Sequence, residues 1–90
     1  MTIYKFNELY DRIDEILWKY WDPMGVNNNE ELRDTYKSYT PHIFRLKTDR
    51  EGKQVIATKL FEIETRIIGF PGNIVHCHSI ADRIEKIRIS

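Results

Sequence analysis

Apolar residues recur at steps of three and four along most of the chain, which is the period of an amphipathic α-helix. The first such run covers residues 3–20, and charged side chains occupy its other face. Its apolar positions are Ile3, Phe6, Leu9, Tyr10, Ile13, Ile16, Leu17 and Tyr20. A residue that precedes proline is disfavoured in helical conformation, so we expect this helix to end near Trp21 or Asp22. Pro23 and Gly25 then shape the turn.

Two shorter helices are expected in the middle of the chain. Asn28 and Asn29 are N-cap candidates for a second helix over residues 30–39, with Leu32, Tyr36 and Tyr39 on one side. Thr40 and Pro41 are typical of an N-cap followed by proline in the first turn, and they predict a third helix over residues 41–47. Residues 48–52 are polar and end in glycine, so they predict a loop.

The rest of the chain predicts two further helical stretches. Residues 53–68 have helical periodicity, and although residues 54–58 alone also suit a strand, the length of the run favours a helix. Residues 69–72 break the chain, and Asn73 is the N-cap candidate of the last helix. That helix has Ile74, Cys77, Ala81, Ile84 and Arg88 near one stripe, widened by Ile80 and Ile87. We therefore expect residues 1–90 to form one all-α domain, a compact bundle of four to five helices.

Composition and charge restrict the function classes. The 41% of hydrophobic residues and 31% of charged residues are ordinary for a globular protein and argue against disorder. Fourteen basic residues balance fourteen acidic ones, so nothing predicts a general attraction to nucleic acid or to an anionic membrane. No apolar run approaches the roughly 18 residues that cross a bilayer. With a single cysteine and no basic-then-apolar leader, we expect a cytoplasmic protein.

The only cluster of potential metal ligands is His76, Cys77 and His78. Neighbours one and two apart on a helix point in different directions, whereas helical ligand pairs use steps of three or four. Cys77 also falls on the apolar stripe, with no oxyanion-stabilising glycine turn beside it. We therefore expect a buried structural cysteine, no metal site and no cofactor.

Acidic and aromatic residues alternate in the first half of the chain. Glu8, Asp11, Asp14 and Glu15 share one broad side of the first helix, Glu30, Glu31 and Asp34 crowd the start of the second, and Tyr4, Tyr10, Tyr36 and Tyr39 lie among them. A run of carboxylates is usually only a solvated face, but this mixture is typical of binding surfaces. Of the two tryptophans, Trp21 continues the apolar stripe, and Trp18 is the candidate for exposure.

Two groups of residues carry a resemblance to a known class of proteins. They are Trp21-Asp22-Pro23-Met24-Gly25-Val26 followed by Tyr36, Tyr39, Pro41 and Ile43, and Glu62-Ile63-Glu64 with Gly69, Pro71 and Gly72. At these residues the chain resembles small bacterial helical proteins that share a Trp-Asp-Pro-hydrophobic-Gly-Val turn, some of which resemble immunity proteins encoded beside polymorphic toxins, including those of contact-dependent inhibition. The resemblance covers about residues 13–72, and Asn27-Asn28-Asn29 replaces the acidic loop that is commoner there.

Together the acidic face and the resemblance predict a non-catalytic immunity protein that binds a cognate toxin and neutralises it by occlusion. If the toxin is a nuclease, its basic cleft would attract carboxylates. The residues expected to bind it are Asp11, Asp14, Glu15, Glu30, Glu31 and Asp34, with Trp18, Tyr36 and Tyr39 as anchors.

Two alternatives remain open from the sequence. The first is a helical adaptor or self-associating domain, monomer or homodimer, in which Ile80, Ile84 and Ile87 form a dimer seam. The second is an enzyme, which would need His42 or His76 to meet a carboxylate in a pocket.

Overall fold

The first amphipathic run forms helix α1 (Ile3–Ile16), which continues as a π-helical turn η1 (Leu17–Trp21). In the computed structural model, backbone is described for residues 3–88 and side chains for residues 6–88, so Ile3 and Tyr4 lie outside the described side chains. The helix ends where the sequence predicts: Asp22 adopts the left-handed conformation, with φ 33°, and its N–H donates to the carbonyl of Leu17. Pro23 has no backbone N–H with which to continue the helix, so the chain leaves the helix axis here.

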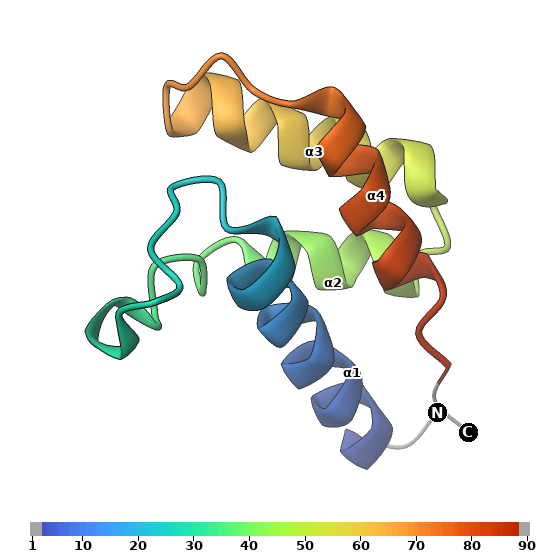
Figure 1. The fold of residues 1–90 in the computed structure, drawn as a ribbon. Coiled ribbons are helices and arrows are strands. Elements are labelled where there is room, and N and C mark those ends of the chain that lie inside the picture. The colour runs from blue at the N-terminus through green and yellow to red at the C-terminus, as the bar shows by residue number, and fades with distance from the viewer. Residues whose placement is uncertain (1–2, 89–90) are drawn as a thin grey trace.

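The remaining α-helices are α2 (Thr40–Thr48), α3 (Lys53–Glu62) and α4 (Ile74–Glu85). A second π-helical turn, η3 (Ile63–Ile67), extends α3, so the prediction of one helical stretch over residues 53–68 is confirmed. Asn73 is the N-cap of α4, as predicted, and its side chain accepts the N–H of His76. The fold class is therefore all-α, and Figure 1 shows α4 lying across α3, with α1 and α2 completing the bundle.

The predicted helix over residues 30–39 is wrong. Only Glu30–Leu32 form a single 3-10 turn, η2, and residues 33–39 follow as successive turns. Leu32, predicted to lie on one side of that helix with Tyr36 and Tyr39, is 42% exposed. The irregular path instead lets Arg33, Lys37 and Tyr36 reach carboxylates on the preceding helical segment, and these tertiary contacts outweigh local helical propensity.

Among residues 6–88, sixteen apolar side chains form one core. They are Leu9, Ile13, Leu17, Trp18, Trp21, Tyr36, Ile43, Ile56, Ala57, Leu60, Ile63, Cys77, Ile80, Ala81, Ile84 and Ile87. Burial of Trp21 and Cys77 is as predicted, but Ile74, predicted on the inner stripe of the last helix, is exposed. Ile80, Ile84 and Ile87 face this core, so the dimer seam of the adaptor alternative has no exposed side chains.

The break between η3 and α4 depends on a close approach at Gly72. This residue has φ +84°, and a Cβ atom there would lie 2.6 Å from the ring of Phe61. Only glycine satisfies both the backbone conformation and the packing without displacing its neighbours. No helix within residues 3–88 combines the length and the apolar character needed to cross a membrane.

Candidate protein-binding surface

Between η1 and α2 the chain runs through residues 23–39 with no helix beyond the single turn η2. In Figure 1 this cyan-to-green segment extends away from the bundle. Connections longer than about 12–15 residues are uncommon in compact domains and are usually either functional or disordered segments. We call residues 23–39 the long loop, and its internal contacts decide whether it is a fixed surface.

Asp22 accepts three hydrogen bonds from the long loop. Its Oδ1 accepts the N–H of Val26 at 2.9 Å and the hydroxyl of Tyr36 at 2.7 Å, while Oδ2 accepts the N–H of Asn27 at 3.2 Å. The Tyr36 oxygen also accepts the N–H of Met24 at 3.0 Å. Burial, the bond to Asp22 and the Asp22 charge together raise the pKa of Tyr36, which stays a neutral donor. One carboxylate thus joins both halves of the long loop.

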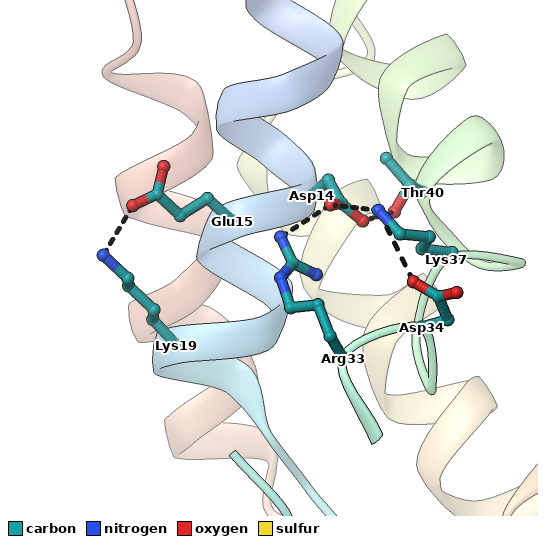
Figure 2. Close-up of polar contacts among 7 residues, drawn as sticks. All are labelled: Asp14, Glu15, Lys19, Arg33, Asp34, Lys37 and Thr40. Atoms are coloured by element: carbon teal, nitrogen blue, oxygen red, sulfur yellow. Dashed lines mark hydrogen bonds and ion pairs between the residues drawn. The ribbon is translucent and has the colours of Figure 1, made fainter. Parts of the chain in front are cut away.

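Asp14, on α1, accepts hydrogen bonds from the second half of the long loop and from α2. Its Oδ2 accepts Nη2 of Arg33 at 2.8 Å and Nζ of Lys37 at 3.0 Å, and its Oδ1 accepts the hydroxyl of Thr40 at 3.0 Å (Figure 2). Burial works against ionisation of Asp14, but the bonds from Lys37 and Thr40 and the charge of Arg33 outweigh it, so its pKa lies below the ordinary value. The Asp14 cluster, meaning Asp14, Arg33, Lys37 and Thr40, therefore holds an ionised carboxylate.

The expectation that Trp18 is exposed is wrong, because only 4% of the residue is accessible. Its ring lies 6.2 Å from that of Tyr36, and the guanidinium of Arg33 covers it at 5.4 Å. Tyr36 is buried and also packs against Trp21 at 5.4 Å. Since a buried side chain cannot touch a partner, Trp18, Tyr36 and Asp14 are corrected from binding residues to supports of the long loop. Tyr39 is half-buried against Trp21.

The other predicted binding residues do lie on the surface. Asp11 and Glu15 are exposed on α1, where Glu15 pairs with Lys19 at 2.6 Å. Glu30, Glu31 and Asp34 are exposed on the long loop. Asp34 is 4.0 Å from Lys37, a cation already shared with Asp14. Among residues 6–88, whose side chains are described, Glu30 and Glu31 enter no ion pair, and the exposed Leu32 follows them directly.

We call Glu30, Glu31, Leu32 and Asp34 the acidic loop surface. It combines carboxylates with one apolar side chain on backbone that is fixed at several points. Asn29 adds a further fixed point, since its Oδ1 accepts the N–H of Glu31 at 3.1 Å and caps the turn η2. The second acidic group predicted from the sequence is thus exposed, whereas the expected aromatic anchors Trp18 and Tyr36 are buried.

Sequence reasoning missed the residues that fix this surface, namely Asp22, Arg33, Lys37 and Thr40. From the sequence, Asp22 marks only the end of the first helix, and Thr40 is an N-cap candidate, whereas in the structure the Thr40 hydroxyl donates to Asp14. One signal was available: Tyr10, Asp14 and Trp18 follow one another at steps of four, which places Asp14 on a stripe bordered by aromatic residues. A carboxylate on such a stripe needs partners from elsewhere in the chain.

A second buried carboxylate, Glu64, joins η1, η3 and α4. Its oxygens accept Nε1 of Trp21 at 3.3 Å, Sγ of Cys77 at 3.1 Å and the N–H of Asn73 at 3.1 Å. Burial and the neighbouring Glu64 raise the pKa of Cys77 to about 12, so the thiol stays protonated. Glu64 thereby links η1 and η3 to the start of α4, across the irregular residues 69–72.

Glu64 also borders a cavity of about 250 Å³ that Asp22 and His76 line, the setting that the enzyme alternative requires. His76 Nε2 is 3.0 Å from the carbonyl of Trp21, and Glu64 is engaged by three donors. These hydrogen bonds connect η1 and η3 to the start of α4. His42 is exposed on α2 and does not line this cavity.

No cluster of three or more His, Cys, Asp or Glu suited to a metal ion occurs among the described residues. Comparison with protein-family models, with curated proteins and with solved structures finds no match to this chain.

Proposed function

We propose that this chain is a non-catalytic binding protein whose acidic loop surface covers a basic surface of a protein partner. The observation that carries this proposal is the exposure of Glu30, Glu31 and Asp34 next to the exposed Leu32 in the sequence. A loop already fixed by Asp22 and the Asp14 cluster loses little conformational entropy on binding.

Charge and shape support such a role. Among residues 6–88, Glu30 and Glu31 enter no ion pair, and such carboxylates attract a basic surface over a distance and speed the encounter at low salt. Leu32, 42% exposed, and Met24, 45% exposed, are apolar side chains on the same loop that a partner would bury. An apolar contact surrounded by polar groups is the usual arrangement of an interface.

We further propose that the partner is a bacterial toxin and that the chain neutralises it by occlusion. This step depends on the resemblance at Trp21–Val26 to proteins that look like toxin immunity proteins. A nuclease toxin would fit the charge, because an enzyme that binds nucleic acid needs a basic cleft. The acidic loop surface would fill that cleft and exclude the substrate.

The test is co-expression of the full chain with the product of the adjacent gene in a host that this product inhibits. We expect growth to be restored and a complex to be isolated, with a dissociation constant below micromolar. Absence of both protection and a detectable complex at micromolar concentration would contradict the proposal. A stable homodimer in sedimentation, with no toxin gene nearby, would favour the adaptor alternative.

A further inference from the structure

A groove of about 440 Å³ lies between α1 and the end of α4, outside the acidic loop surface. Its lining residues are Arg12, Glu15, Ile16 and Tyr20 from the first helical segment and Arg83, Lys86 and Ile87 from the last. A volume of this size is within the range of small-molecule sites. Three of the seven lining side chains are cations, which sets the groove apart from the acidic surface described above.

Acidic neighbours neutralise only some of these cations. Lys86 pairs with Asp82 at 2.8 Å, and Glu15 pairs with Lys19 at 2.6 Å. Where side chains are described, over residues 6–88, neither Arg12 nor Arg83 makes an ion pair. Two guanidinium groups thus border the same groove with donors left for an anion.

Arg83 and Tyr20 form a cation–π pair at the groove, which we call the Arg83–Tyr20 platform. The guanidinium carbon of Arg83 lies 4.0 Å from the centroid of the Tyr20 ring, close enough for direct stacking. Tyr20 remains 46% exposed, although a large aromatic side chain is usually buried in a domain of this size. The floor beneath is apolar, formed by the half-buried Ile16 and the buried Ile87.

We propose that this groove binds a small organic phosphate of nucleotide type. Arg12 contacts the phosphate groups, because its guanidinium has no carboxylate partner among residues 6–88 and matches two phosphate oxygens at once. Lys86, which also pairs with Asp82, adds a point charge at the edge of the groove. A planar ring packs on the Arg83–Tyr20 platform, which offers a stacking face next to a charge. The proposal uses a surface apart from the acidic loop surface and is independent of the toxin partner.

The test is an NMR titration of the isotope-labelled full chain at low salt with ATP, inorganic pyrophosphate and adenosine. We expect ATP to cause saturable shifts of amides around Tyr20 and Arg83. Pyrophosphate, lacking the ring, is expected to bind about tenfold more weakly, and adenosine, lacking the charge, not to saturate. Added salt should weaken the ATP complex.

Substitutions distinguish a specific ATP site in the groove from a general electrostatic attraction of ATP to the chain. Arg12→Gln is expected to weaken ATP binding about tenfold, whereas Arg66→Gln removes an exposed cation from η3, outside the groove, and should leave it unchanged. Arg83→Lys keeps the charge but loses the planar stack, and should weaken ATP more than pyrophosphate.

Three outcomes would overturn the proposal: no saturable shift up to about 10 mM ATP, equal effects of the Arg12 and Arg66 variants, or saturation by hexaglutamate without any by ATP. The last outcome would identify the groove as a site for an acidic protein segment instead.

Discussion

Asp14 is the residue on which the shape of the long loop depends most. Its side chain is 8% exposed and lies between two cations and a hydroxyl that come from the long loop and α2. Removing one partner of such a cluster leaves the others without their bonds, which costs more than the bonds contribute on average. The chemistry of this single carboxylate therefore sets the stability of a segment many residues away.

Asp14→Asn should lower the free energy of unfolding by about 1–3 kcal/mol at neutral pH, because the amide carries no charge and accepts fewer bonds. The folded pKa of Asp14 is lowered, so its contribution is complete above the ordinary value of 3.8 and is lost as the pH falls through the folded pKa. Urea unfolding between pH 7 and pH 2.5 measures both effects. The variant should lose less stability than the native chain over this acid range.

The matched control is Asp34→Asn, whose carboxylate is 82% exposed. It should change the free energy of unfolding by less than about 0.5 kcal/mol. If the two variants have the same free energy of unfolding at neutral and at acid pH, the Asp14 cluster does not stabilise the folded chain.

Cys77 provides a second test at the residue scale. Because its pKa is raised to about 12 and the residue is fully buried, almost no thiolate is present at neutral pH. A thiol reagent such as dithionitrobenzoate should react with the native chain only through unfolding, and promptly in about 6 M guanidinium chloride. Rapid stoichiometric labelling of the folded protein at pH 7 would contradict the burial of this thiol.

At the scale of elements, predictions from local signals were mostly correct. The end of the first helix at Trp21 follows from Pro23, and the start of α4 follows from the cap at Asn73. The helical assignment of residues 53–68 follows from periodicity and length. These signals lie within a few residues of what they determine, which is why sequence alone carries them.

The long loop could not be predicted in the same way. Glu30, Leu32, Tyr36 and Tyr39 satisfy a helical pattern, yet the bonds that decide the backbone come from Asp14 and Asp22. The ring of Trp18 is likewise covered by Arg33, which lies fifteen positions later in the sequence. Contacts between distant residues are not encoded in local periodicity.

Tyr36→Phe tests whether the long loop is fixed by its hydroxyl. The substitution removes a bond to Asp22 and an acceptor for the N–H of Met24, while the buried ring stays. We expect a loss of about 1–2 kcal/mol in stability and faster hydrogen exchange at Met24 and Val26. Tyr39→Phe is the control, since its ring is only half-buried. Unchanged exchange at Met24 in Tyr36→Phe would contradict this account.

For the whole molecule, zero net charge conceals two different surfaces. Glu30, Glu31 and Asp34 gather on the long loop, while Arg12, Arg83 and Lys86 line the groove between α1 and α4. The sequence predicts a set of acidic binding residues. The structure leaves Glu30, Glu31 and Asp34 of this set exposed and buries Asp14. A balanced composition therefore argued against general attraction to nucleic acid without excluding local charged sites.

The central claim is that the acidic loop surface binds a basic protein, and charge reversal tests it most directly. The variant Glu30→Lys with Glu31→Lys is compared with Glu51→Lys plus Glu62→Lys, which changes the net charge equally at exposed residues elsewhere. Association with the adjacent gene product is measured by biolayer interferometry at two salt concentrations, after circular dichroism shows that both variants fold. We predict that the loop variant associates at least about tenfold more slowly and loses its salt dependence, while the control resembles the native chain. Equal association by both variants would contradict the claim.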